Sequence, residues 1–108
     1  MAVQRRKVSD GELREIARFF YTLKDILRLR ILVALADGQE MTVTELARTL
    51  HISQPLVSFH LRPLRLFGLV QVRRVGRAVY CSLNLPEIER RQTEFIALLT
   101  SGTDWKSV

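Results

Sequence analysis

Hydrogen-bonding and cationic side chains recur along one segment of the sequence at the spacing of a helical face. The polar stripe of this segment consists of Gln54, Ser58, Arg62 and Arg65. At 100° per residue these positions fall within about 80° of one another, while the apolar residues between them point the other way. An amide can pair with two atoms of one base edge, and a guanidinium can pair with two phosphate oxygens. The stripe therefore suits a nucleic acid, although an ordinary solvated helix face is the commoner source of such a pattern.

The basic residues are segregated along the chain. The formal net charge is +6, and the interval between Glu45 and Glu87 contains no acidic residue. Six arginines lie in that interval, so the remainder of the chain has no net charge. Because neutralised phosphates release their counterions, a local basic surface favours a polyanion as the partner. A merely solvated basic face is the alternative, and the segregation weighs against it.

The length and composition restrict the class of protein. A chain of 108 residues accommodates one domain with one hydrophobic core. Hydrophobic residues make up 47% and charged residues 26% of the chain, as in soluble globular proteins. The longest apolar run covers residues 31–36, whereas a membrane-spanning helix needs about 20 residues. With no signal-peptide pattern at the N-terminus, we expect a cytoplasmic protein without a membrane partner.

Two helices are predicted in the first third of the chain. Apolar residues at helical spacing follow Ser9 and Asp10, two candidate caps, and predict a helix over residues 11–24. Asp25 is the expected N-cap of a second helix, and Gly38 supplies a left-handed stop that ends it.

Two short helices then form a helix-turn-helix. Thr42 followed by Glu45 fits a capping box, so a third helix starts there. Ser53 is the expected N-cap of the fourth helix, and Pro55 is tolerated in its first turn, where no intrahelical donor is needed. The polar stripe lies on this fourth helix, which spans residues 53–67.

A hairpin and a last helix complete the pattern. Strand-like alternation on both sides of Gly76 predicts a two-stranded wing over residues 70–83 with a basic tip. Pro86 opens a final helix, and Gly102 closes it.

The predicted fold is mainly α with a small β-hairpin: a winged helix-turn-helix of about five helices and a two-stranded wing. One DNA-binding and dimerisation domain is expected over residues 11–102. A flexible arm of residues 1–10 precedes it, and a tail of residues 103–108 follows it.

Five short blocks give this pattern a family resemblance. They are LRLRIL at 27–32, TELA at 44–47, SQPLVSFHLR at 53–62, FGLV at 67–70 and RRVGRAVY at 73–80. In this order and spacing they resemble the ArsR/SmtB-type bacterial repressors over roughly residues 15–100. The resemblance implies a homodimer that binds an operator near its promoter and releases it when an effector binds.

Together, the stripe, the basic hairpin and the resemblance predict a dimeric, sequence-specific repressor that binds an inverted-repeat operator in double-stranded DNA. We expect Gln54 to read a base edge, since its amide can pair with N6 and N7 of adenine. The wing arginines flank a glycine turn and can approach the backbone or a narrow minor groove, although exposed hairpin charges are an equal alternative for any one of them. The predicted DNA-binding residues are Thr42, Thr44, Ser53, Gln54, Pro55, Ser58, Phe59, Arg62, Arg65, Arg73, Arg74 and Arg77.

Three residues of the fourth helix depart from the family pattern. Pro55 stands where relatives often have a small hydroxyl residue, and Phe59 where they often have His or another polar residue. Phe59 either contacts a thymine methyl or sugar, or packs on a neighbouring element. Pro63 removes a backbone bond to the carbonyl of Phe59 and is expected to kink the helix axis.

The family's metal-binding residues are missing. Metal-sensing relatives carry cysteine pairs at the start of the third helix, where this chain has Thr42 and Thr44, and hydroxyls are poor ligands for soft metals. Other relatives use Asp, His and Glu on the last helix, which here has Glu87, Glu89 and Glu94 but no histidine. We therefore predict no metal and no cofactor, and a small organic effector held between the first and last helices is one hypothesis.

Three other reactive side chains are interpreted as structural. His60 lies at the centre of the apolar face and is expected to be partly buried and bonded to backbone, and His51 to be a solvated turn residue. Cys81 is the single cysteine, so no intrachain disulfide can form. It is interpreted as a small half-buried hydrophobe on the second wing strand, with redox pairing across a dimer as the less favoured alternative.

Apolar faces on the first and last helices predict the dimer interface. Symmetric pairing of these faces would place two recognition helices about 34 Å apart, which matches an approximately palindromic operator. The alternative is that these faces only close the monomer's core. The predicted interface residues are Leu13, Ile16, Phe20, Ile88, Phe95 and Leu99.

Catalysis finds no support in the sequence. It has no Ser, His and Asp set in a plausible arrangement, no glycine-rich phosphate loop and no perturbed carboxylate pair, so we predict no enzyme activity. The competing hypothesis is a winged-helix protein-interaction module without operator-specific DNA binding.

Overall fold

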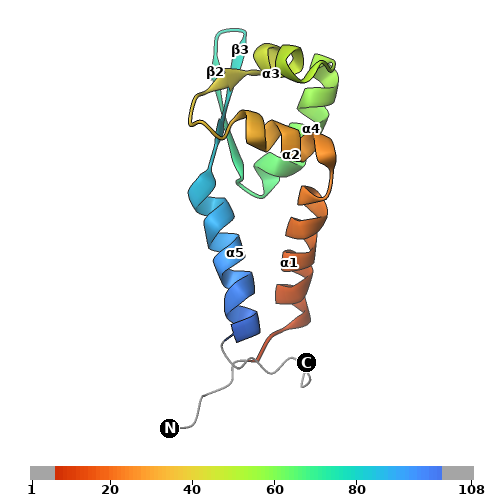
Figure 1. Ribbon diagram of the computed structural model, residues 1–108, viewed down its shortest axis with the longest axis vertical. Coiled ribbons are helices and arrows are strands. Elements are labelled where there is room, and N and C mark those ends of the chain that lie inside the picture. The colour runs from red at the N-terminus through yellow and green to blue at the C-terminus, as the bar shows by residue number, and fades with distance from the viewer. Residues whose placement is uncertain (1–6, 101–108) are drawn as a thin grey trace.

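Two long helices at the ends of the chain extend away from a body built by the central elements (Figure 1). The computed structural model describes residues 7–100, so Gly102 and the tail, predicted to stop and follow the last helix, lie outside the described residues. The elements are α1 (Asp10–Leu23), α2 (Ile26–Ala34), β1 (Met41–Thr42), α3 (Val43–Leu50), α4 (Gln54–Leu66), β2 (Val70–Val75), β3 (Ala78–Leu83) and α5 (Leu85–Thr100).

Side-chain caps fix where the first two helices begin. The Ser9 hydroxyl accepts from the Glu12 N–H at 3.2 Å, while the Ser9 N–H donates to the Glu12 carboxylate at 3.0 Å. This is a complete capping box, so the first of the two predicted caps is the one used. The Asp25 carboxylate caps α2 by accepting the N–H groups of Leu27 and Arg28 at 2.9 and 3.3 Å. Val8 is buried, although it lies within the predicted arm.

Helix α2 ends earlier than the sequence predicts. It ends at Ala34, and the predicted stop, Gly38, has φ +82° in the turn that follows. Leu35 is fully buried and still adopts a right-handed conformation. Backbone hydrogen bonds between residues three positions apart form the turn that follows. One of them runs from the Gly38 N–H to the Leu35 carbonyl at 3.3 Å.

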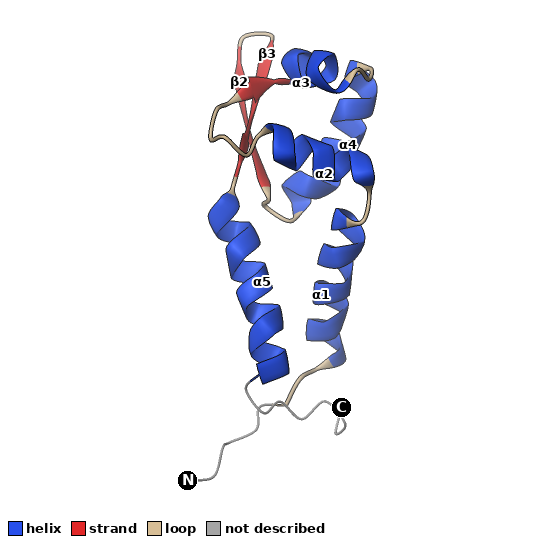
Figure 2. Ribbon diagram, in the orientation of Figure 1, coloured by secondary structure: helices blue, strands red, loops and turns tan. Residues whose placement is uncertain are grey.

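The described sheet has three strands, not the two of the predicted wing (Figure 2). β2 and β3 form the hairpin, with Gly76 at φ +57° in its tip. β1 pairs with the other edge of β3, where Met41 lies opposite Cys81 and Thr42 opposite Tyr80. A two-residue strand is too short to produce a periodic pattern, so it could not be predicted from the sequence. This strand anchors the start of α3 beside the wing.

The core lies among α2, α3, α4, the end of α1 and one face of the sheet. Val57, Leu61 and Leu64 bury one side of α4 in it, which leaves the opposite side of that helix facing outward. Helix α4 continues through Pro63 to Leu66. Among residues 7–100, no helix is both long enough and apolar enough to span a membrane. The fully buried side chains of the core are Phe19, Ile31, Leu35, Leu46, Val57, Leu64, Leu69 and Cys81.

Candidate nucleic-acid interface

A groove between α3, α4 and the wing gathers most of the predicted DNA-binding residues. Its volume is about 430 Å³. Its floor includes Leu61 and Val72, which belong to the core or pack against it. Eight of the twelve predicted residues line it, namely Thr42, Thr44, Gln54, Ser58, Arg62, Arg65, Arg74 and Arg77.

The groove's positive charge is not neutralised within the protein. The four arginines that line it form no ion pair with any carboxylate of residues 7–100, and no acidic residue lines the groove. Elsewhere in the described chain, Arg14, Arg18, Arg73, Arg90 and Arg91 are each paired with an acid. Four of the seven described arginines without a carboxylate partner therefore lie where the hydrogen-bonding side of α4 is exposed, which favours an anionic partner.

Local capping positions the two helices that border the groove. The Ser53 hydroxyl accepts from the Leu56 N–H at 3.3 Å and starts α4, and Pro55 occupies its first turn. The Thr42 hydroxyl accepts from the Glu45 N–H at 3.0 Å and starts α3. Only this half of the predicted Thr42–Glu45 capping box is present in the structure. Ser53 thus acts as a cap outside the groove lining, whereas Thr42 both caps α3 and lines the groove.

The three wing arginines do not act as one group. Arg74 and Arg77 line the groove, but Arg73 does not. The Arg73 guanidinium donates to both Glu40 carboxylate oxygens at 2.8 and 3.2 Å, and it stacks 4.8 Å from the centre of the Tyr80 ring. These bonds lower the pKa of Glu40 below its usual value. Successive side chains of a strand point to opposite faces of the sheet, so the sequence contains a signal that places Arg73 and Arg74 on different faces of the wing.

Pro55 and Phe59 lie outside the groove lining. Both are exposed on α4, and Phe59 retains 59% of its accessible surface. The Phe59 ring meets the ring of His60 edge-on, with the ring centres 5.2 Å apart. His60 belongs to the same helix and Phe59 is not among the residues packed against the core, so the alternative that Phe59 packs on a neighbouring element finds no support.

His60 is buried, but its described partner is a side chain and not the predicted backbone group. Its Nδ1 accepts from the Arg28 Nε–H at 3.3 Å and lies 3.8 Å from the Asp25 carboxylate. Arg28 also reaches the Thr22 carbonyl at 3.5 Å. Burial alone would raise the pKa of Asp25, but the backbone N–H groups of Arg28 and Leu27, with the charges of His60 and Arg28, lower it. This cluster connects α2 to the buried side of α4, and sequence spacing gave no signal for the role of Arg28.

Cys81 is completely buried in β3, rather than half-buried as predicted. Burial raises the pKa of its thiol. The thiolate is the reactive form, so this environment opposes the redox alternative. Among residues 7–100, no group of three or more His, Cys, Asp and Glu side chains could hold a metal ion.

Helices α1 and α5 carry the predicted dimer face. The Phe20 and Phe95 rings meet edge-on with centres 5.0 Å apart, so the two helices touch within one chain. Leu13 remains 40% exposed, Phe20 39% and Leu99 69%. Ile88 instead packs against the core, which makes it the least suitable of the predicted interface residues.

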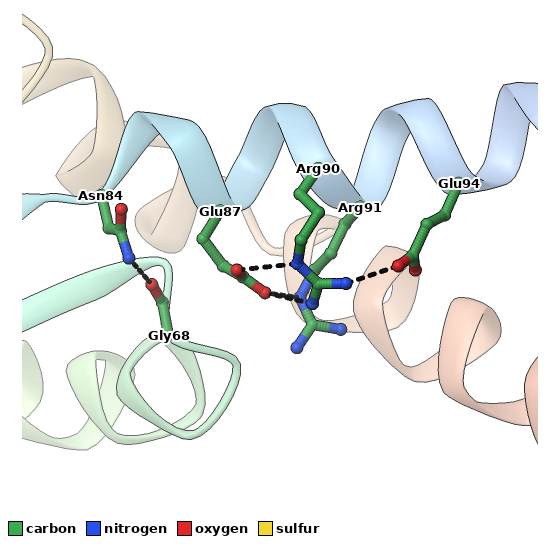
Figure 3. Close-up of polar contacts among 6 residues, drawn as sticks. All are labelled: Gly68, Asn84, Glu87, Arg90, Arg91 and Glu94. Atoms are coloured by element: carbon green, nitrogen blue, oxygen red, sulfur yellow. Dashed lines mark hydrogen bonds and ion pairs between the residues drawn. The ribbon is translucent and has the colours of Figure 1, made fainter.

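A polar network joins the start of α5 to the body (Figure 3). The Asn84 amide donates to the Gly68 carbonyl at 2.9 Å, just after α4. The Glu87 carboxylate accepts from both Arg90 and Arg91, and the Arg91 guanidinium lies 4.8 Å from the centre of the Phe67 ring. These contacts with Gly68 and Phe67 fix the direction of α5 relative to the end of α4. The groove between α1 and α5 has a volume of about 390 Å³, and both arginines that line it are ion-paired, Arg90 with Glu87 and Glu94 and Arg91 with Glu87.

Comparison with known proteins agrees with this geometry. Residues 25–72 match the family described as bacterial regulatory protein, arsR family. The transcriptional repressor SmtB homologue of Synechocystis sp. is 46% identical over 81 residues, which cover 75% of this chain but only 61% of that relative. The arsenic resistance transcriptional regulator ArsR2 of Pseudomonas putida is 37% identical over 87 residues, which cover 80% of this chain and 75% of the relative.

Solved structures extend the similarity to the fold. A homodimeric winged helix-turn-helix DNA-binding domain from Mycobacterium bovis is 29% identical, with a TM-score of 0.67. The match covers 90% of this chain and 89% of that domain. The winged helix-turn-helix prediction is thereby confirmed. The chain belongs to the arsR family of bacterial regulatory proteins, a family of transcriptional regulators and not of enzymes.

Proposed function

We propose that this protein is a homodimeric transcriptional repressor that binds an inverted-repeat operator in double-stranded DNA. The observation that carries the proposal is the groove in which four unpaired arginines border the hydrogen-bonding side of α4. DNA affinity depends strongly on cations that neutralise phosphates, and specificity depends on side chains that reach base edges. The groove supplies both kinds of group on one surface.

Each side of the groove has its own role in this proposal. Helix α4 enters the major groove, where Gln54 pairs with an adenine and Ser58 contacts a neighbouring base edge. Arg62 and Arg65 reach the phosphates that flank these bases. Arg74 and Arg77 on the wing bind the next stretch of backbone or its minor groove.

The dimer forms through α1 and α5. Support comes from the apolar side chains that these helices leave exposed beyond the body, and from the homodimeric state of the similar M. bovis domain. Such a dimer presents two α4 helices related by a two-fold axis, so the operator has two half-sites about 34 Å apart. A protein that binds chromosomal operators acts in the cytoplasm.

The effector of this protein is not a thiolate-bound metal. The relatives named for arsenic resistance and for SmtB are 37% and 46% identical, yet this chain has a single cysteine, and Cys81 is completely buried. Thr42 and Thr44 offer only neutral hydroxyls at the start of α3. Titration of the DNA complex with arsenite, zinc and cadmium should leave it intact, and release by any of them at micromolar concentration would refute this part.

Selection of bound fragments from sheared genomic DNA, followed by footprinting, tests the proposal as a whole. We expect protection of a short inverted repeat, and sedimentation of a homodimer in the absence of DNA. Gln54→Ala should change the sequence preference, whereas Arg74→Ala should weaken all sequences similarly. A monomer that selects no DNA, or binding untouched by both substitutions, would favour the protein-interaction module.

A further inference from the structure

The outward surface of α4 carries an apolar stripe beside its polar one. Pro55, Phe59 and Leu66 follow one another along the helix, each about 100° around the axis from the polar residue directly before it and all within about 60° of Arg62. All three are exposed, Phe59 at 59% and Leu66 at 81%. The recognition helix therefore presents hydrogen-bonding and apolar side chains to the same side of the molecule.

Phe59 is the central residue of this apolar stripe. It directly follows Ser58, which lines the groove, and it lies three residues before Arg62 on the same helix. Its ring is held edge-on against the buried His60, which restricts where the ring can point. Apart from this contact, Phe59 does not join the core cluster or the residues packed against it.

The neighbouring charges indicate what covers this ring. Arg62 and Arg65 flank the apolar stripe without any carboxylate partner among residues 7–100, which favours a partner that is anionic at its edges. A DNA major groove combines phosphate edges with an apolar group on its floor, the C5-methyl of thymine. A purely apolar protein surface or lipid would leave these two arginines without counter-charges.

We infer that Phe59 is a specificity-determining residue whose ring contacts the C5-methyl group of a thymine in each operator half-site. The inference rests on the proposed function, because it requires α4 to lie in the major groove. It adds an apolar contact to the base reading by Gln54, so the preferred half-site contains a thymine adjacent to the base that Gln54 reads.

Replacement of thymine by uracil tests this contact, since it removes only the methyl group. Each thymine of the selected operator is replaced in turn, and the Kd is measured for the wild-type protein and for Phe59→Ala. One position in each half-site should weaken wild-type binding by about fourfold, the change expected for one methyl-sized group. The same substitution should leave the Kd of Phe59→Ala unchanged.

Control variants separate this contact from folding. Phe59→Leu keeps an apolar side chain and should retain part of the preference for thymine over uracil. Val33→Ala removes another exposed apolar side chain, 75% exposed on α2, and should keep the full preference. Circular dichroism and melting temperature show whether each variant is folded.

The outcomes distinguish the two proposals. Tolerance of uracil at every position by the wild type, or an unchanged preference in folded Phe59→Ala, overturns the inference while leaving operator binding in place. Failure to select any DNA overturns the proposed function together with the inference. A purely apolar protein partner for Phe59 would appear as the first outcome, because uracil would then have no effect.

Discussion

Arg73 and Arg74 are adjacent in β2, yet their guanidinium groups lie on opposite faces of the wing. Arg74 lines the groove beside α4, and Arg73 is bound by Glu40 through two hydrogen bonds. Arg73 therefore already has an acidic partner within the protein, whereas the Arg74 guanidinium has none among residues 7–100. This pair gives a matched comparison for the DNA-binding surface.

Arg74→Gln should weaken DNA binding and flatten its dependence on salt, whereas Arg73→Gln should leave both nearly unchanged. Each phosphate contact adds about 0.9 to the slope of log K against log salt concentration, so a dimer that loses two contacts changes this slope by about 2. Fluorescence anisotropy at several salt concentrations measures the slope. Equal losses for the two variants would contradict the assignment of the wing faces.

Glu40→Gln tests the same relationship from the acidic side. Without the carboxylate, Arg73 loses its ion pair but remains on the face of the wing away from the groove, so we expect DNA affinity and its salt dependence to stay close to those of the wild type. The double variant Glu40→Gln with Arg73→Gln should likewise keep the wild-type slope, and a steeper slope in Glu40→Gln alone would place Arg73 at the DNA. Weaker binding by Glu40→Gln alone would show that the ion pair holds the wing in its DNA-binding position instead.

The start of α4 depends on the Ser53 cap. Ser53→Ala removes the acceptor for the Leu56 N–H and should lower the free energy of unfolding by about 1 kcal/mol. Ser53→Asn supplies another acceptor and should restore most of the loss. Urea unfolding at one fixed protein concentration measures both variants, because dimerisation makes stability depend on concentration. An equal loss in Ser53→Asn would refute the capping role.

Much of the fold could be predicted because the sequence carries strong local signals. The caps at Ser9, Asp25, Thr42 and Ser53 are all used as predicted, since each side chain satisfies an N–H group of its own helix. The polar stripe of α4 was recognisable because its spacing depends only on helix geometry. These features are decided within a few residues of the chain.

The errors concern contacts between distant segments. The pairing of β1 with β3, the Arg28–His60 bond and the Arg73–Glu40 bond each join residues at least 32 positions apart. No local pattern encodes such contacts, so His60 was assigned a backbone partner and the Glu40 partner of Arg73 could not be foreseen. The early end of α2 is a local difference, since a tighter turn from Leu35 to Gly38 separates the helix from its glycine, which still adopts the predicted left-handed conformation.

The charge of Asp25 should stabilise the protein near neutral pH and lose its effect in acid. Its pKa is lower in the folded chain than the ordinary value of about 4. A lowered native pKa contributes stability that is complete above the unfolded pKa and is lost as pH falls through the native pKa.

Asp25→Asn keeps the capping group without the charge and is the matched variant for this effect. Urea midpoints of wild type and variant should differ most above about pH 5 and converge as pH falls through the lowered native pKa of Asp25. A difference that stays constant, or widens in acid, would contradict the lowered pKa of Asp25.

Cys81 should resist alkylation in the native protein. Its side chain is fully buried and burial raises the pKa of the thiol, so both access and thiolate formation are suppressed. Iodoacetamide labelling followed by mass spectrometry should be slow in buffer and fast in denaturing urea. Rapid native labelling, or a disulfide-linked dimer on mild oxidation, would revive the redox alternative.

The salt dependence of operator binding by two charge-matched triple variants tests the groove assignment most directly. One variant converts Arg65, Arg74 and Arg77 to Gln, and the other converts Arg14, Arg30 and Arg73. If the groove binds DNA, the first should flatten the slope of log K against log salt concentration by about 5 for a dimer, while the second keeps the wild-type slope. Equal slopes for the two variants would show that only total charge matters, and would contradict the assignment of this groove as the DNA-binding surface.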